Sequence, residues 1–241
     1  MQLSLVIPAY NEQDRIADTL RHTIAYLGNQ SYDAEVVVVD DGSRDATSEV
    51  VQGFVSEINP QVRLVRLPEN RGKGFAVRTG MFEHAAGAFR VFYDADASTP
   101  IEDLEKLWPR FSAGADIVIG SRALPDSDVQ VHQAWYRETM GRIFNGILRI
   151  LALTRFKDTQ CGFKGFTARA CEIVFPRQTV ERFSFDAELL VIAAAHGLRI
   201  DEAPVHWRNR PQSRVHPVHD SARMLLDLFV IRWKELRGRY K

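Results

Sequence analysis

Val36-Val37-Val38-Val39 runs directly into Asp40-Asp41-Gly42-Ser43, and this stretch decides the fold class. Four consecutive β-branched residues are typical of a strand that is buried on both faces of a parallel sheet. A second apolar run, Leu3 to Ile7, leads into Pro8-Ala9-Tyr10-Asn11-Glu12. Ligands of open α/β sheets bind beyond the carboxyl ends of such strands, so these polar clusters predict a ligand site.

Strand-like and helical stretches alternate along the first half of the chain. Strands are expected at 3–8, 35–39, 62–67, 89–94 and 116–119, and helices at about 12–27, 45–57, 73–86 and 101–112. This order predicts an α/β fold with a mainly parallel, Rossmann-like sheet flanked by helices. At 241 residues and 45% hydrophobic content, the chain is expected to form a single domain over 1–241.

A third polar cluster, Asp94-Ala95-Asp96, follows the apolar run from Phe89 to Tyr93. Residues i and i+2 at the end of a strand project to the same side, so the two carboxylates can converge on one cation. Mg²⁺ uses one or two protein carboxylates and completes its octahedron with water and substrate phosphate. Acidic residues also close many strands as solvated turn residues. Three neighbouring strands with polar ends favour the metal site over that alternative.

These motifs, with Asn70-Arg71-Gly72-Lys73-Gly74, occur in the order typical of family 2 glycosyltransferases with the GT-A fold. The second half of the chain resembles the polyprenyl-phosphate (dolichyl-phosphate) glucose and mannose synthases within that family. The motifs that carry this resemblance are Gly120-Ser121-Arg122, Asp158-Thr159-Gln160-Cys161-Gly162-Phe163-Lys164, Phe185-Asp186-Ala187-Glu188, Val205-His206-Trp207 and Ser213-Arg214-Val215. The match extends from about Leu3 to about Leu236. It implies a nucleotide-binding half, 1–120, and an acceptor-binding half, 121–241.

The resemblance implies a nucleotide-sugar site and a metal, Mg²⁺ or Mn²⁺. Asp94 and Asp96 would bind the metal, and Asp96 is expected to be catalytic. Asp41 would accept a hydrogen bond from the nucleobase. The other expected donor contacts are Pro8, Ala9, Tyr10, Glu12, Arg71, Lys73, Ser213 and Arg214. For Tyr10 and Glu12 the alternative is a purely structural role in capping the next helix.

The implied acceptor, a polyprenyl phosphate, is already ionised at neutral pH. Its oxygen needs positioning and charge compensation more than a general base. The resemblance places Arg122 and Arg137 at this phosphate, which a guanidinium can bind with two hydrogen bonds. Both arginines are therefore expected to be catalytic together with Asp96. The remaining residues expected on the acceptor and sugar side are Gln160, Lys164, Asp186 and Glu188.

Residues 206–241 carry nine Lys or Arg against three Asp or Glu, a charge of +6 in a chain whose formal charge is zero. Within them, an apolar stripe at helical spacing includes Leu226, Phe229 and Trp233; a similar stripe begins at Met140. Such helices either pack on the core or lie in a membrane interface. No nucleic-acid-binding module accompanies the basic residues, so an anionic membrane surface is the expected partner.

Two cysteines only, Cys161 and Cys171, predict a reducing compartment. The longest late apolar run, Met224 to Ile231, is shorter than the ~20 residues that span a bilayer. We therefore expect a cytoplasmic protein, peripheral on the inner face of the membrane, with a homodimer as one arrangement to test.

The sequence predicts an inverting, metal-dependent transferase that moves a hexose onto a polyprenyl or dolichyl phosphate. The segment from Asp158 to Lys164 favours glucose from UDP-glucose. Four alternatives stay open: GDP-mannose as the donor, a hydroxyl acceptor with Asp186 as base, a nucleotidyltransferase, and a nucleotide-sugar-binding module without catalysis. The nucleotidyltransferases usually open with a Gly-rich basic loop, whereas this chain has Pro8-Ala9-Tyr10-Asn11-Glu12.

Overall fold

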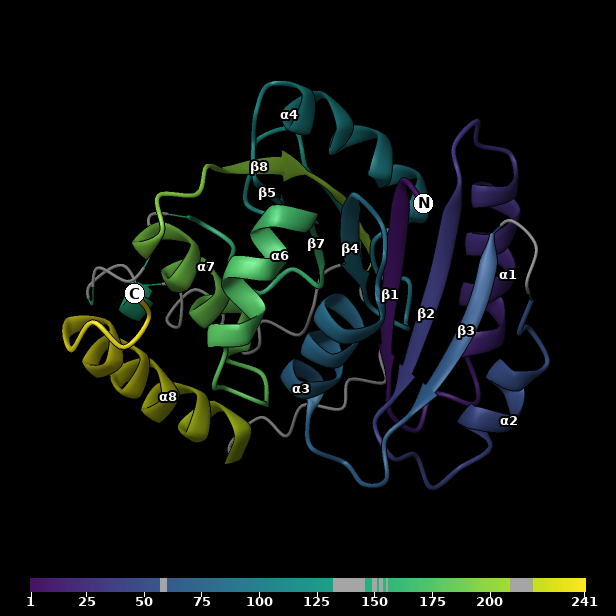
Figure 1. The fold of residues 1–241 in the computed structure, drawn as a ribbon, viewed down its shortest axis with the longest axis horizontal. Coiled ribbons are helices and arrows are strands. Elements are labelled where there is room, and N and C mark those ends of the chain that lie inside the picture. Colours follow the sequence, from purple (N-terminus) through teal and green to yellow (C-terminus); the bar gives the residue numbers. More distant parts are fainter. Residues whose placement is uncertain (57–59, 132–145, 149–150, 152–153, 155, 209–218) are drawn as a thin grey trace.

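The computed structural model describes residues 1–56, 60–131, 146–148, 151, 154, 156–208 and 219–241. Seven strands form one sheet in the order β3-β2-β1-β4-β7-β5-β8 (Figure 1). Every neighbouring pair is parallel except the two made by β7, which runs antiparallel to both β4 and β5. The strands are β1 Leu3–Ala9, β2 Ala34–Asp40, β3 Gln61–Arg66, β4 Phe89–Tyr93, β5 Ile117–Ser121, β7 Phe163–Thr167 and β8 Ile200–Pro204. The predicted α/β class and mainly parallel sheet are confirmed.

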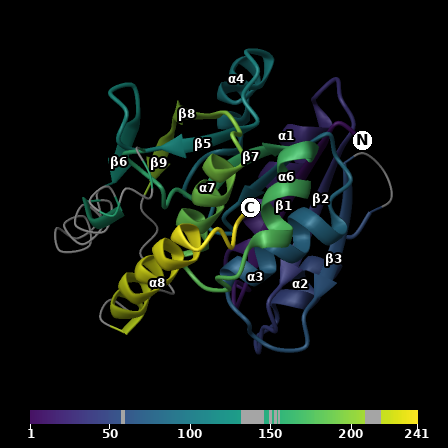
Figure 2. The ribbon, with the colours of Figure 1, turned by 60° about the vertical axis from the view of Figure 1, so that its left-hand side comes forward.

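Helices cover both faces of this sheet (Figures 1 and 2). One face carries α1 (Ile16–Gly28), α2 (Thr47–Gln52), the 3₁₀ helix η2 (Ile101–Lys106) and α4 (Trp108–Ser112). The other carries α3 (Lys73–Arg78), the π-helix η1 (Thr79–His84), α6 (Ala168–Val174), η3 (Phe175–Arg177), α7 (Phe185–Ala195) and α8 (His219–Leu236).

The strand β2 shows why the fold forms. Its four valines are fully buried and alternate between the two faces. Val36 and Val38 pack against α1 and α2, whereas Val37 and Val39 pack against α3 and η1. An alternation of this kind, with apolar residues on both sides, is what a central strand between two helical layers requires.

The second half of the chain contributes β7 and β8 to the same sheet and adds a two-stranded parallel sheet, β6 (Asp128–Val131) with β9 (His206–Arg208). The division into halves at 120/121 stays a prediction. The helix predicted from Met140 lies largely outside the described residues. The part of it that the structure describes, 146–148, is helical.

Two predicted helices are divided in the structure. The helix expected over 73–86 continues beyond Arg78 as the π-helix η1, where a Cβ on Gly80 would lie 2.3 Å from the side chain of Val6. The helix expected over 101–112 is a 3₁₀ helix followed by α4, which has Pro109 in its first turn. Proline is tolerated there because the first N–H groups of a helix have no intrahelical partner.

Candidate active site

The strands β1, β2 and β4 end at one edge of the sheet, toward which the arrowheads of β1 and β2 point in Figure 1. At this edge the Asp41 N–H donates to the Ala9 carbonyl (2.8 Å). Helix α1 joins the same region, because the Thr19 hydroxyl donates to the carbonyl of Ala95, the middle residue of the Asp-x-Asp motif (2.7 Å). The three polar clusters are therefore brought together as predicted.

The Asp94 carboxylate is half-buried and forms an ion pair with Lys73 (Oδ1 to Nζ, 2.6 Å). Burial raises the pKa of Asp94, the Lys73 ammonium opposes this, and the nearby Asp96 and Asp186 add to it. Burial disfavours the Lys73 charge, yet Asp94 and Asp186 together raise the pKa of Lys73 above its ordinary value. The motif from Arg71 to Gly74 thus places one ammonium between two predicted site carboxylates.

Asp96 lies two residues further on, and its Oδ1 accepts a hydrogen bond from the Ser98 N–H (2.9 Å). Among the described residues there is no cluster of three or more His, Cys, Asp or Glu side chains placed to hold a metal. Two carboxylates are nevertheless the usual protein contribution to a Mg²⁺ site that substrate phosphates complete. The hard oxygen donors of Asp94 and Asp96 fit Mg²⁺ or Mn²⁺.

Arg15 is a charged residue near the Asp-x-Asp motif that the sequence did not single out. It precedes α1, and its guanidinium pairs with the buried Glu12 carboxylate (Nη2 to Oε1, 2.8 Å). The hydrogen bond that Arg15 donates to Glu12 raises the pKa of Arg15, and the negative charges of Asp96 and Asp94 contribute to the same effect. Glu12, predicted to line the base and ribose, therefore holds an arginine beside the Asp-x-Asp loop. No motif spacing identifies a single arginine of this kind.

The Asp41 carboxylate organises the turn that follows β3. It accepts hydrogen bonds from the Asn70 side chain (2.8 Å) and from the backbone N–H groups of Arg71 (2.9 Å) and Gly72 (2.8 Å). Burial raises the pKa of Asp41, and the two backbone bonds oppose this. Gly72 has φ +117°, which favours glycine. Contact between Asp41 and a nucleobase stays a prediction.

The other predicted donor residues differ in how they are held. Pro8 and Ala9 are buried at the end of β1, and Tyr10 is half-buried directly after it. The Arg71 guanidinium pairs with Glu181 and lies 3.5 Å from the centre of the Phe75 ring. Ser213 and Arg214 lie outside the described residues.

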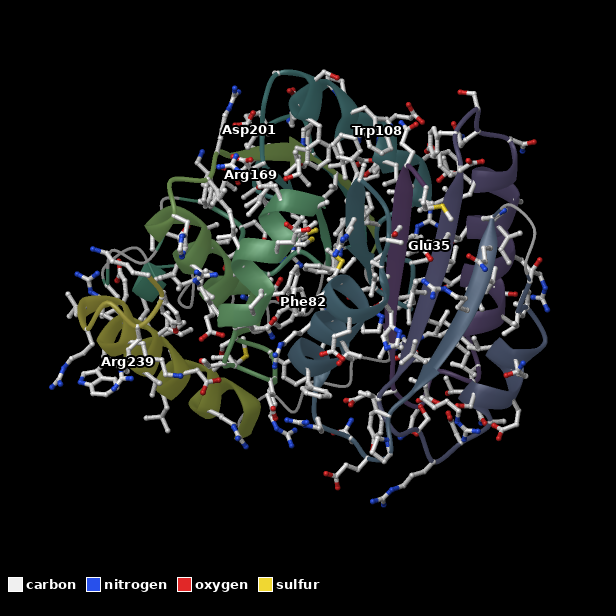
Figure 3. All side chains as sticks on the ribbon, in the orientation of Figure 1. Glu35, Phe82, Trp108, Arg169, Asp201 and Arg239 are labelled. Atoms are coloured by element: carbon white, nitrogen blue, oxygen red, sulfur yellow. The ribbon has the colours of Figure 1, made fainter. Side chains whose placement is uncertain are left out.

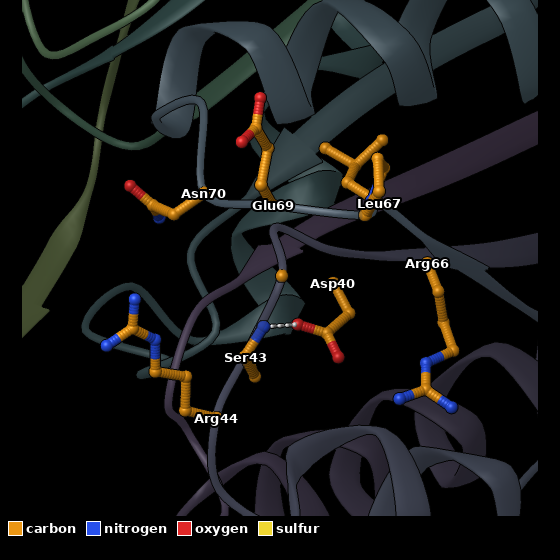
Figure 4. Close-up of a pocket in the computed structure, with 9 residues that line it drawn as sticks. Asp40, Ser43, Arg44, Arg66, Leu67, Glu69 and Asn70 are labelled. Carbon is orange, nitrogen blue, oxygen red and sulfur yellow. Dashed lines mark hydrogen bonds between the residues drawn. The ribbon is translucent and has the colours of Figure 1, made fainter.

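A cavity of about 530 Å³ adjoins the donor side, between the loops that follow β2 and β3 (Figure 4). Asp40 is central to it, with its carboxylate accepting from the Ser43 N–H (2.9 Å) and from the Ser48 hydroxyl. Its remaining lining residues are Gly42, Arg44, Arg66, Leu67, Pro68, Glu69 and Asn70. The two carboxylates of the Asp-Asp-Gly turn are thus both anchored in the protein.

On the predicted acceptor side, Arg122 is clamped by Asp158. The carboxylate accepts from the Arg122 backbone N–H (2.9 Å), Nε (2.6 Å) and Nη2 (2.8 Å), and the guanidinium lies 5.3 Å from the centre of the Trp207 ring. Burial opposes ionisation of Asp158, but the Arg122 charge and hydrogen bonds lower the pKa of Asp158 to about 2. Gln160 donates its backbone N–H to the same carboxylate (3.1 Å). Arg137 lies outside the described residues.

Lys164 and Asp186, both predicted to bind acceptor or sugar, form a buried ion pair (Nζ to Oδ1, 2.5 Å). The Lys164 side chain is fully buried, and its ammonium also donates to the Cys161 carbonyl (2.5 Å). A charge buried in this way needs its partner, because an unpaired buried ion is strongly destabilising. Direct contact of Lys164 with an acceptor therefore receives no support from its position.

Glu188 is fully buried, and its hydrogen bonds connect separate parts of the fold. Its carboxylate accepts from the N–H groups of Thr179 (2.8 Å) and Val180 (2.7 Å) and from the hydroxyls of Thr179 and Tyr240. Because these partners occupy both oxygens, the predicted role of Glu188 in binding acceptor or sugar is likewise unsupported by its position.

Comparison with known proteins adds independent findings. Residues 4–174 match the model of the family described as "Glycosyl transferase family 2". The chain is 37% identical to a dolichyl-phosphate beta-glucosyltransferase of Trichomonas vaginalis, over 95% of this chain and 70% of that protein. It is 35% identical to the Homo sapiens dolichyl-phosphate beta-glucosyltransferase, over 100% of this chain and 78% of that protein.

Among solved structures, the fold is similar to glucosyl-3-phosphoglycerate synthase from Mycobacterium tuberculosis in complex with Mn²⁺ and UDP-glucose. The TM-score is 0.71 at 18% identity, with 96% of this chain and 78% of that chain covered. The same enzyme in complex with Mg²⁺ and UDP gives a TM-score of 0.71 at 19% identity over 96% of this chain and 79% of that chain. These likenesses show the GT-A fold.

Proposed function

We propose that this chain, which belongs to glycosyl transferase family 2, transfers glucose from UDP-glucose to a polyprenyl phosphate of the dolichyl type. The observation that carries the substrate assignment is 35–37% identity to dolichyl-phosphate beta-glucosyltransferases over 95% or more of the chain. The donor-side geometry is compatible with it, since Asp94 and Asp96 follow the end of β4 and the Lys73 ammonium pairs with Asp94.

Asp94 and Asp96 would hold the divalent ion. When bound, that ion acts as a Lewis acid that stabilises charge on the leaving diphosphate. Lys73 and Arg15 add positive charge beside the same position and so favour the binding of the donor phosphates.

Arg122 positions the acceptor. Asp158 engages its Nε and Nη2, which fixes the guanidinium and leaves Nη1 for a phosphate oxygen. The phosphate oxygen attacks the anomeric carbon in line, a carbon–oxygen bond forms as the bond to UDP breaks, and the product is a β-linked glucosyl phosphate. The attacking oxygen carries no proton, so no general base is required.

The protein would also bind an anionic membrane surface, through α8. Five large apolar side chains on this helix are exposed: Leu226 (66%), Phe229 (57%), Val230 (44%), Trp233 (51%) and Leu236 (70%). Their spacing places them on one face, whereas Leu228 and Ile231 are fully buried against the protein. Among the described residues no helix is long and apolar enough to cross a membrane.

Basic residues flank the exposed stripe on α8, and Arg239 follows it near the C-terminus (Figure 3). The chain just beyond the C-terminal end of α8 is anchored to the protein, because the Tyr240 hydroxyl donates to Glu188 (2.7 Å) and the Tyr240 carbonyl lies 2.7 Å from Nε2 of His196. An exposed apolar stripe beside basic side chains is the pattern of an interfacial helix. An anionic bilayer would also supply the lipid acceptor.

Transfer is tested by incubating the full chain and Mn²⁺ with radiolabelled UDP-glucose or GDP-mannose and dolichyl or undecaprenyl phosphate. We expect label from UDP-glucose in an organic-phase product, and none with Asp96→Ala or in EDTA. Preferred transfer from GDP-mannose would correct the donor. Transfer only to hydroxyl acceptors, or hydrolysis alone, would overturn the proposal.

Membrane binding is tested by co-sedimentation with vesicles of phosphatidylcholine and phosphatidylglycerol at low salt. We expect binding that high salt weakens and that Phe229→Ser with Trp233→Ser abolishes. Val55→Ser is the matched control, because Val55 is also exposed (41%) but belongs to another part of the surface. If the double variant loses a dimer and keeps vesicle binding, the stripe is a homodimer interface instead. The cytoplasmic location of the protein is tested separately, by cell fractionation.

A further inference from the structure

Gly162 lies against the carboxylate of Asp94. A Cβ built on this glycine would be 1.8 Å from Asp94 Oδ2 and 2.2 Å from its Cγ. Real Cβ atoms essentially never approach another heavy atom within 3.0 Å. The space that Asp94 occupies is therefore available only because residue 162 has no side chain.

The backbone conformation does not explain this glycine. The described glycines with positive φ are Gly42, Gly72, Gly114, Gly197 and Gly238, and Gly162 is not among them. Its φ is thus accessible to other residues, and the constraint is the space in front of its Cα.

The two residues face each other because of the sheet. Tyr93 of β4 pairs with Phe163 of the antiparallel strand β7, which brings Asp94 opposite Gly162. The Asp94 N–H donates to the Gly162 carbonyl (3.2 Å), while Lys73 contacts the Asp94 carboxylate (2.6 Å). The carboxylate therefore lies against the bare Cα of Gly162 while it is paired with the Lys73 ammonium.

We propose that Gly162 is a positioning residue that sets where the Asp94 carboxylate, and with it the divalent ion, can sit. The inference rests on the proposed function only for the metal role of Asp94. Gly162 belongs to the segment from Asp158 to Lys164, which also fixes Arg122 through Asp158 and Asp186 through Lys164. One segment therefore sets the relative positions of the donor and acceptor sides.

Gly162→Ala is the direct test. The atoms it would strike belong to the free end of a side chain, so the added methyl should displace the carboxylate by more than about 1 Å and leave the fold intact. We expect Mn²⁺ affinity, measured by electron paramagnetic resonance in the presence of UDP, to fall by about 10- to 100-fold, as for other residues that orient metal ligands. Binding of UDP without metal and the melting temperature should change little.

Gly28→Ala is the matched control, because a Cβ there would meet nothing nearer than 4.0 Å. The decisive comparison is Gly162→Ala in an Asp94→Ala background. If the glycine acts through Asp94, the double variant binds Mn²⁺ no more weakly than Asp94→Ala alone.

Wild-type affinity in Gly162→Ala, or a further loss in the double variant, would overturn the inference while leaving the metal role of Asp94 intact. Unchanged affinity in Asp94→Ala would overturn both. A protein that shows the expected Mn²⁺ results but transfers no glucose would overturn the proposed function alone.

Discussion

Replacing Asp158 by Asn should lower the free energy of unfolding by about 2 kcal/mol at neutral pH. The Asp158 side chain is 5% exposed and accepts three hydrogen bonds from Arg122 and one from Gln160. An amide is neutral and presents one oxygen, so the variant leaves the Arg122 guanidinium without its counter-charge.

The magnitude follows from the pKa of Asp158, which the Arg122 charge lowers from 3.8 to about 2. Each pKa unit corresponds to about 1.4 kcal/mol of differential stabilisation, which gives about 2 kcal/mol. The folded-state pKa lies below the unfolded-state value. The stabilisation is therefore complete above about pH 5, about half lost at pH 3, and absent once the pH has fallen through 2.

Urea unfolding of the wild type and Asp158→Asn at pH 7 and pH 3 measures this gap. Asp201→Asn is the control, because its partner Arg199 is half-exposed and such surface pairs contribute about 0–1 kcal/mol. Equal gaps at the two pH values, or no gap at pH 7, would refute the assignment of a stabilising carboxylate to this position.

Three further outcomes are expected. Arg122→Ala should raise the KM for the lipid phosphate and leave UDP affinity, measured by calorimetry, near normal; loss of UDP affinity would move this arginine to the donor side. Asp41→Ala should raise the KM for UDP-glucose more than it lowers kcat, and a normal KM with a collapsed kcat would contradict its place at the base. Tyr240→Phe removes one hydrogen bond to the Glu188 carboxylate, so urea unfolding should show a loss of about 1–2 kcal/mol with transfer retained, and unchanged stability would refute the anchor.

The strands of the first half could be predicted from sequence because strands that are buried on both faces are nearly continuous runs of apolar, β-branched residues. Val36–Val39 needed no information from elsewhere in the chain. Strand β7 was not predicted as a strand. It contains Lys164, whose charge is compensated by Asp186, 22 residues away. Pairing over that distance leaves no local pattern.

The site shows the same contrast. Asp94 and Asp96 were predictable from their position after an apolar run, and Lys73 from the glycines around it. Arg15 was missed because only the folding of α1 against the Asp-x-Asp loop brings it there. For α8 the periodicity predicted a helix with an apolar stripe but could not decide what covers it. The structure shows Leu228 and Ile231 inside and the longer stripe outside.

The central place of β7 also sets the order in which the molecule can be completed during synthesis. Strand β4 emerges from the ribosome about seventy residues before its partner strand β7, Phe163–Thr167. One edge of β4 therefore stays unpaired until β7 has been synthesised. Unpaired edges of this kind recruit other chains and favour aggregation. A fragment ending near residue 120 would carry that open edge permanently, and should be rescued in solution by the remainder of the chain supplied in trans.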